Sequence, residues 1–495
     1  MKHSGIFARY SLLVNLLTCQ LAYLLLFLTA CGDNDNIISP DREGTNAAKF
    51  GFLPTNTAEE NVKILQQGLD SLGNIYVDLP GIYDLDSAIY LNNNTKITFG
   101  KGVYIRKQRN KNGKGAEYVF INRGAYSRTY NENIEINGLN LICNGLDDNH
   151  SAIQGLVGQV SFFHVRNLTI KDFTCIDLLT TRFCVQIAEF ENIFIENVYI
   201  QGNKDGIHLG VGKDFIIRNG IFKTFDDPIA LNAHDYDISN PTVGWIENGL
   251  IENCYDLQNA TTTGFFCRIL AGSWVDWYQG MKLQKSDIAV HDGRLYRVIA
   301  PPDGKEYVSY TAPTHKSGYQ TIDGINWYMM QEGIIYNGGC RNIHFKNIYL
   351  QKDRETAFSI HFDMDKWSRS YYPNSEAPVQ SNLVFENIHI NGKLGNLLST
   401  YTPVDKLQFI NLNWSGGNII LSSVTGLDYP STKITLEKTH FAANALVSLV
   451  ANNGRSADLE IKNSFFDPNY QLYLRGDITV LTSDVPYYFI ESKIR

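Results

Sequence analysis

The amino-acid sequence predicts an all-β solenoid. The specific expectation is a right-handed parallel β-helix with an N-terminal capping helix and a small inserted β module. Three observations support it: a recurring nine-residue pattern, spacings of 22 and 25 residues between successive copies, and two aspartate segments that superimpose at an offset of 22 residues. A period in the twenties is typical of solenoids rather than of β-sandwiches.

The recurring pattern reads Asn-apolar-x-apolar-x-Asn-x-x-apolar. Copies start at Asn133, Asn167, Asn192, Asp214, Asn342 and Asn382, with weaker copies near 245–251, 433–441 and 459–466. Alternating apolar residues indicate strands with one buried face. Asn and Gly at fixed offsets indicate turns with left-handed backbone. An antiparallel all-β fold is the alternative, and nothing indicates a helical repeat.

Length and composition agree with one long coil. The chain has 495 residues, which is more than one ordinary core holds, but a solenoid grows along one axis without splitting. Its net charge of −8 argues against nucleic acid as a partner and against attraction to an anionic membrane surface. The 28 Tyr, 26 Phe and 6 Trp are expected mainly in the core, although aromatic rings also suit the faces of sugars.

Residues 1–30 are predicted to be a lipoprotein signal peptide. Lys2 and Arg9 supply positive charge, and an apolar run follows at Leu21–Leu28. The sequence Leu-Thr-Ala-Cys-Gly that ends the segment resembles the lipobox of bacterial lipoproteins, which implies that Cys31 is the acylated first residue of the mature chain. A single-pass transmembrane anchor is the alternative, but the apolar run is short for one.

Residues 31–49 are expected to form a flexible tether. Their acidic stretch Asp33-Asn-Asp-Asn36 resembles the surface-export tags of Bacteroidota lipoproteins. The resemblance implies a protein that is lipid-anchored in the bacterial outer membrane and exposed at the cell surface.

The remaining chain divides into three expected parts: residues 50–274 and 333–495 of the coil, and an inserted β module at 275–332. Thr57 and Glu60 predict a capping box for a short helix. This opening segment resembles the entry of pectate-lyase-like β-helices and phage tailspikes, where a helix covers the open end of the first coil. In the module, Trp277, Tyr296 and Trp327 suit either a sugar-stacking surface or the module's own core.

The cysteines predict neither a metal site nor a cofactor. Apart from Cys19 and Cys31, six remain, without a C-x-x-C motif or zinc-ligand spacing. Most fall at strand positions, so they are expected as small residues stacked inside the coil.

Three aspartates form the candidate catalytic site. The sequence Asp205-Gly-Ile-His-Leu superimposes on Asp227-Pro-Ile-Ala-Leu, and Asp226 precedes the second segment. If the 22-residue offset is one coil, these side chains lie on adjacent strands about 4.8 Å apart. Carboxylates that close cannot all ionise, so one is expected to keep a proton near neutral pH. An acid beside a base is what glycosidic bond cleavage requires.

The motifs Asn203-Lys-Asp205, Asp226-Asp227 and Arg268-Ile269 together resemble the polygalacturonase-type glycoside hydrolases (family 28). The resemblance implies Asp226 as general acid, Asp205 and Asp227 as the pair that holds water for an inverting hydrolysis, and Arg268 and Asn203 as substrate-binding residues.

The sequence departs from that family at several positions. Lys204 replaces Thr, Pro228 replaces Cys, no Gly-His-Gly follows Asp227, and Leu270 replaces a lysine that grips a uronate. A galacturonan substrate is therefore in doubt, while the acid–base residues are present. Asn248 lies roughly where the Gly-His-Gly motif is expected.

Two histidines are further candidates for substrate contact. His208 falls in the same outward row as Ala230 and Arg268 when the segments are superimposed, and His234 follows the aspartate pair closely. Each is equally compatible with an ordinary surface or turn histidine.

Two other functions remain open. A calcium-dependent polysaccharide lyase would use the aspartates to hold the ion and Arg268 as base. A non-catalytic glycan-binding lipoprotein would bind oligosaccharide without cleaving it. All three hypotheses share a polysaccharide or oligosaccharide as the partner.

Overall fold

The computed structural model describes residues 44–148, 151–259, 263–364, 368–424 and 429–490. The predicted signal peptide, the lipid site at Cys31 and most of the tether lie outside these residues. Among the described residues, no helix is both long and apolar enough to cross a bilayer.

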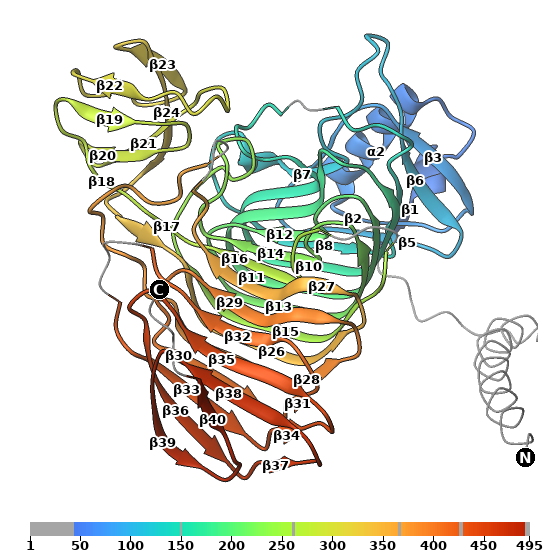
Figure 1. Cartoon of the computed structure of the whole chain (residues 1–495). Helices are drawn as coiled ribbons and strands as arrows, with labels where there is room; N and C mark the ends of the chain where they lie inside the picture. The colour runs from blue at the N-terminus through green and yellow to red at the C-terminus, as the bar shows by residue number, and fades with distance from the viewer. Residues whose placement is uncertain (1–43, 149–150, 260–262, 365–367, 425–428, 491–495) are drawn as a thin grey trace, which may run out of the picture. The chain divides into compact units, whose positions relative to one another are not determined.

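The described chain winds into a parallel β-helix (Figure 1), as the sequence predicted. Equivalent residues of successive coils pair in parallel: Val165 faces Phe190, and Phe190 faces Gly212. These registers reproduce the spacings of 25 and 22 residues. The alternation of apolar and polar residues places the isoleucines, leucines and phenylalanines of the repeat in one continuous buried core.

The N-terminal end of the coil is covered by helix α2 (Ala58–Leu72). Its N-cap Thr57 and Glu60 form the predicted capping box, with each side chain bonded to the other's backbone N–H. Leu65 and Leu69 pack into the core beneath. The first coils comprise β1 (Thr45–Asn46), η1 (Ala47–Phe50), β2 (Asn74–Val77), β3 (Gly81–Leu85), β4 (Ile89–Leu91), β5 (Thr95–Phe99), β6 (Val103–Lys107), β7 (Phe120–Asn122), η2 (Arg123–Ala125), β8 (Asn131–Asn137) and β9 (Asn140–Ile142).

The central coils carry the longest strands. They comprise β10 (Gly158–Leu178), β11 (Phe183–Gly202), β12 (Ile207–Leu209), β13 (Gly212–Thr224), β14 (Ile229–Asn232), β15 (Ile246–Asp256), β16 (Cys267–Leu270), β26 (Cys340–Leu350), β27 (Arg354–His361), β28 (Ser381–Ile390) and β29 (Leu394–Thr400). The C-terminal coils follow as β30 (Lys406–Ile410), β31 (Asn413–Trp414), β32 (Asn418–Leu421), β33 (Thr432–Glu437), β34 (His440–Phe441), β35 (Leu446–Ala451), β36 (Ser456–Lys462), β37 (Phe465–Phe466), β38 (Gln471–Arg475), β39 (Asp477–Ser483) and β40 (Tyr488–Ile490).

An inserted β module interrupts the coil between β16 and β26. It comprises β18 (Val275–Asp276), β19 (Met281–Leu283), β20 (Ile288–His291), β21 (Arg294–Val298), β22 (Tyr307–Ser309), β23 (Tyr319–Ile322) and β24 (Ile325–Glu332), closed at its base by β17 (Gly272–Ser273) against β25 (Asn337–Gly338). Tyr296 and Trp327 are fully buried in the module's own core, and Trp277 packs on the same cluster. A sugar-stacking role for Tyr296 and Trp327 is therefore wrong, because neither presents a face to solvent.

Asparagine ladders run along the turns, as the repeat predicted. Asn133 donates to Asn94 at 2.8 Å, Asn167 to Asn133 at 3.0 Å and Asn192 to Asn167 at 2.8 Å. The backbone at these residues is left-handed, which asparagine tolerates better than most residues do. The six cysteines of the described coil are buried free thiols, in agreement with the prediction.

Candidate active site

Three short parallel strands position the candidate site. In the ladder of β12, β14 and β16, His208 faces Ala230, and Ala230 faces Arg268. This is the row that the superimposed segments predicted. Asp205 and Asp227 lie directly before β12 and β14, where the Gly206 N–H donates to the Asp227 carbonyl at 2.9 Å.

The three aspartates converge. Carboxylate oxygens of Asp205, Asp226 and Asp227 all lie within 4.8 Å of one another. The side chains of Asp205 and Asp227 are 1% and 2% exposed, whereas that of Asp226 is 25% exposed. Asp226 is therefore the member of the trio that a large molecule reaches most easily.

Asp205 is a buried but ionised carboxylate. Its oxygens face the Lys204 ammonium at 3.5 Å and the Nδ1 of His208 at 3.1 Å. Burial by itself would raise the pKa of this carboxyl, but Lys204, His208 and Arg268 together lower it well below its ordinary range. Asp205 therefore carries a negative charge at every physiological pH.

The pKa of Asp227 is shifted in the opposite direction, upward. Burial and the charges of Asp226 and Asp205 raise its pKa to about 8, against the opposing effect of Arg268 and of the Phe265 amide. That amide donates to Asp227 at 2.7 Å. The trio thus retains one proton near neutral pH, as the crowding of the carboxylates predicted, and the proton belongs to the coupled group rather than to one residue.

Gly264 permits this crowding. Its backbone is left-handed, with φ of +66°, and an added Cβ would lie 2.6 Å from oxygens of both Asp226 and Asp227. A side chain here would displace the carboxylates, so glycine is required beside them.

Lys204 is a cation that pairs with the aspartate trio. It forms an ion pair with Asp226 as well as with Asp205, and its ammonium lies 5.5 Å from the centre of the Phe183 ring. Burial would lower the pKa of Lys204, but Asp205 and Asp226 raise it above its usual range. The sequence marked this residue only as a departure from the family pattern.

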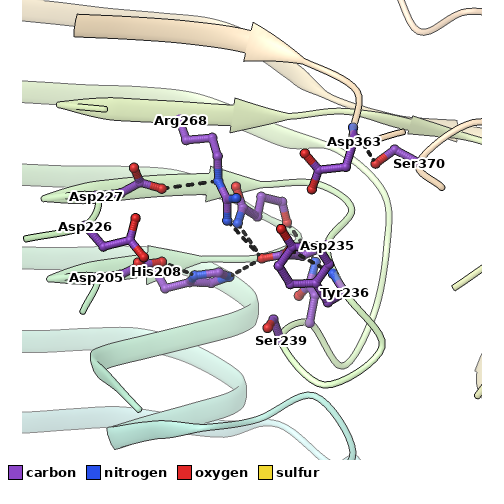
Figure 2. A network of polar contacts seen from close by, with 12 residues as sticks. Asp205, His208, Asp226, Asp227, Asp235, Tyr236, Ser239, Arg268, Asp363 and Ser370 are labelled. Carbon is purple, nitrogen blue, oxygen red and sulfur yellow. Dashed lines mark hydrogen bonds and ion pairs between the residues drawn. The ribbon is translucent and has the colours of Figure 1, made fainter. Parts of the chain in front are cut away.

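Arg268 and His208 link the aspartates through a fourth one (Figure 2). Arg268 places its Nε 3.2 Å from Asp227 and its Nη2 3.2 Å from Asp235. His208, which is fully buried and stacked on Phe183, contacts Asp205 on one side and lies 3.6 Å from Asp235 on the other. Asp235 comes from the loop after β14, which no sequence pattern identified.

A histidine–aspartate pair from the next coil borders the site. β16 pairs with β27, so that Arg268 faces Ser359 and Leu270 faces His361. His361 bonds Ser359 at 2.8 Å and Asp363 at 3.2 Å. The sequence offered a signal, because Arg268-Ile-Leu superimposes on Ser359-Ile-His, but the inserted module hides the period.

Three other predicted residues, Asn203, His234 and Asn248, make no hydrogen bond or ion pair with the trio within the part of the chain that the structure describes. Asn203 is exposed, and its backbone N–H donates to Leu178. His234 is buried with its ring 6.3 Å from Trp274, and burial together with Arg297 lowers its pKa well below the ordinary value. Asn248 belongs to an asparagine ladder, where it donates to Asp214 at 2.9 Å.

The spacing of the carboxylates differs from the expectation for inversion. Inverting glycosidases separate their carboxyl groups by about 6.5–9.5 Å, and retaining ones by about 5–5.5 Å. The oxygens of the trio lie within 4.8 Å of one another. The nearest oxygens of the trio are thus closer together than either range.

The raised pKa of Asp227 predicts that the difference in stability between the wild type and Asp227→Asn depends on pH. Between about pH 4, where an aspartate in the unfolded chain ionises, and pH 8, the folded protein holds a proton that the unfolded chain releases. Stability contributed by this group is therefore present below pH 4 and is lost as the pH rises to 8. Asp227→Asn has no such group, so the thermal stability of the wild type should fall relative to the variant between pH 5 and 8. Parallel melting-temperature profiles would contradict the assignment.

Comparison with known proteins identifies only distant similarities. No family model matches the sequence, and no curated protein matches it. The family 28 exopolygalacturonase of Yersinia enterocolitica is 12% identical with a TM-score of 0.43, covering 89% of this chain and 79% of that one. The polygalacturonase of Erwinia carotovora is 12% identical with a TM-score of 0.41, covering 92% and 100%.

A third neighbour has a different activity. The A-module of a mannuronan C-5 epimerase from Azotobacter vinelandii is 9% identical with a TM-score of 0.38, covering 91% of this chain and 100% of that one. The structural neighbours are thus polygalacturonases and other parallel β-helix proteins. At these identities their functions do not carry over, and function must be inferred from the site itself.

Proposed function

We propose that this protein is a glycoside hydrolase that cleaves a polysaccharide or oligosaccharide with Asp205, Asp226 and Asp227. The observation that carries the proposal is the convergence of the three carboxylates, of which Asp226 is partly exposed. An acid and a base in contact are the groups that glycosidic cleavage needs.

The burial of each carboxylate suggests its role. Asp227 holds the proton of the resting trio and passes it to Asp226, the most exposed member, which then gives it to the oxygen of the leaving sugar. Asp205, held ionised by Lys204 and His208, accepts a proton from the attacking water. Arg268 keeps Asp227 and Asp235 in place, which makes it a positioning residue as well as a candidate for substrate binding.

Water, rather than a carboxylate, is the proposed nucleophile. A retaining mechanism requires an aspartate to form a bond with the anomeric carbon. Asp205 and Asp227 are almost fully buried, so neither reaches a sugar ring, whereas a water molecule is small enough to bind between them. This favours inversion of the anomeric carbon in spite of the short carboxylate spacing.

A calcium-dependent lyase is the second candidate, because three close carboxylates also suit a divalent cation. Lys204 argues against it. Its ammonium already neutralises Asp205 and Asp226, so a calcium ion would have to displace it or accept its repulsion. The residues therefore fit a metal-free site better.

The test is a screen of plant and host polysaccharides for newly released reducing ends. We expect the wild type to release them with or without EDTA, and Asp226→Asn to be nearly inactive. Activity that requires calcium and yields an unsaturated, ultraviolet-absorbing sugar ring would instead establish a lyase. Saccharide binding without any product would establish a glycan-binding protein.

We further propose that Cys31 is lipidated and anchors the protein in the outer membrane at the cell surface, because the sequence before it resembles a lipobox. Cells expressing Cys31→Ala should release the protein into the soluble fraction or accumulate it with its signal peptide. The check is membrane fractionation with mass determination of the N-terminus. Normal membrane attachment of the variant would contradict this proposal.

A further inference from the structure

A cavity of about 990 Å³ lies between the coil and the inserted module, apart from the aspartate trio. Its coil wall includes Arg128, His164 and Glu189, and its module wall includes Tyr319 and Tyr328. Lys204, Asp205, Asp226, Asp227 and Arg268 are absent from its lining. Its volume is at the upper end of the range of about 300–1,000 Å³ for small-molecule sites.

Three residues that line this cavity have a left-handed backbone, which is unfavourable for most side chains. Left-handed φ angles of the non-glycine residues that the structure describes fall almost entirely on Asn and Asp; the exceptions are Arg128, His164, Glu189, Ser286 and Lys438. Three of these five line one cavity. Asparagine would be easier to accommodate at each position, so the side chains of His164 and Glu189 are candidates for a function in this cavity.

His164 and Glu189 occupy equivalent positions on adjacent coils. The flanking residues pair in register, Phe163 with Ala188 and Val165 with Phe190. The left-handed backbone turns both side chains away from the strand row at the same corner of the coil. The imidazole is wedged between the rings of Phe163, at 4.2 Å, and Tyr130, at 5.2 Å.

The pKa values of both groups are shifted toward their uncharged forms. Burial and the nearby Arg128 lower the pKa of His164 to about 4, so the ring is neutral at physiological pH. Burial raises the pKa of Glu189, against Thr242 and Arg128. Neither ring nitrogen of His164 has a hydrogen-bond partner among the described residues. A neutral imidazole offers one donor and one acceptor, which is the complement of a sugar hydroxyl.

Hydrogen bonds and one ion pair fix other parts of the cavity. Arg128 donates to the Met330 carbonyl and, at 2.9 Å, to the Tyr328 hydroxyl, which ties the module to the coil. At the rim, Lys213 pairs with Glu191 at 3.1 Å. The Lys213–Glu191 pair therefore adds no unpaired charge at the rim.

Two exposed aromatic rings line the same cavity as His164 and Glu189. Tyr126 and Tyr319 line the cavity and are 45% and 53% exposed. The Tyr319 hydroxyl donates to Gln154 at 2.6 Å, which holds the ring against the coil. An exposed aromatic face beside hydrogen-bonding groups matches a sugar ring, which has an apolar face and a polar edge.

We propose that this cavity binds a neutral oligosaccharide, whose ring contacts Tyr126 or Tyr319 and whose hydroxyls bond His164 and Glu189. The site is separate from the trio and does not require the proposed hydrolysis. It would hold a glycan chain against the coil independently of cleavage.

The test uses a glycan array that carries neutral and uronate-containing oligosaccharides, probed with the full-length protein carrying Asp226→Asn to prevent turnover. The strongest neutral glycan is then titrated calorimetrically. His164→Asn and Glu189→Asn each should weaken its binding by about tenfold, because each removes hydrogen bonds from a partly buried pair of side chains. Both variants should keep or raise the melting temperature, since asparagine suits the left-handed backbone.

Lys438→Asn is the matched control. It relieves the strain of a left-handed backbone at a residue that does not line the cavity, so it should leave glycan binding unchanged. The proposal is overturned if no neutral glycan is retained, if only uronates are retained, or if affinity survives in both His164→Asn and Glu189→Asn. Because binding is read without cleavage, an inactive trio would not affect the result.

Discussion

Replacing Asp226 with asparagine is expected to lower turnover by about 10²–10⁴-fold, the usual contribution of a general acid or base. Asparagine preserves the size of the side chain but carries no proton that it can donate. Affinity for the saccharide should change little, because the remaining lining of the trio is untouched. The measurement is kcat and KM on the substrate that the polysaccharide screen identifies.

Asp214→Asn is the appropriate control for that variant. Asp214 lies at a left-handed turn of the next strand, β13, where it accepts a hydrogen bond from Asn248, and asparagine is the usual residue at such turns. We expect full activity from it. Equal losses in Asp214→Asn and Asp226→Asn would mean that the effect comes from the fold rather than from the site.

The second large expected effect is a loss of stability when the buried ion pair between Asp256 and Arg354 is broken. Asp256 and Arg354 form a two-bond ion pair at 2.6 and 3.0 Å with both side chains fully buried. Arg354 also donates to the Thr263 carbonyl, next to the segment whose Phe265 amide binds Asp227. Asp256→Ala should lower the free energy of unfolding by about 3–5 kcal/mol, since it leaves a buried cation without its partner.

A partly exposed pair of the same kind provides the comparison. Arg106 and Asp84 also pair through two bonds, but their side chains are 33% and 24% exposed. Asp84→Ala should cost about 0–1 kcal/mol. Denaturant unfolding of both variants measures the difference, and a loss in Asp256→Ala no larger than in Asp84→Ala would show that the buried pair is not needed. The double change Asp256→Leu with Arg354→Met should recover much of the stability.

The sequence predicted the fold because both the turn residues and the alternation of buried and exposed residues repeat from coil to coil. Asparagines such as Asn133, Asn167 and Asn192 mark the left-handed turns, and the residues between them alternate between core and surface. The offset between Asp205 and Asp227 equals the register of their strands, so the pair was visible without coordinates.

Other parts of the site depend on contacts that carry no period. Asp235 reaches Arg268 from a loop, and Lys204 stands one position before the repeated segment, so neither belongs to the pattern. His361 was hidden by the inserted module, which adds its length between two paired strands. The aromatic residues of the module were ambiguous because a small core and a sugar-binding face use the same residue types.

The central claim is that the aspartate trio hydrolyses a glycosidic bond with water as the nucleophile. The most direct measurement is proton NMR of the first product formed by the wild type, before the sugar mutarotates. We expect a saturated reducing end whose anomeric configuration is opposite to that of the cleaved bond, and almost none of it with Asp226→Asn. A product that keeps its configuration, contains an unsaturated ring, or forms equally well with Asp226→Asn would contradict the claim.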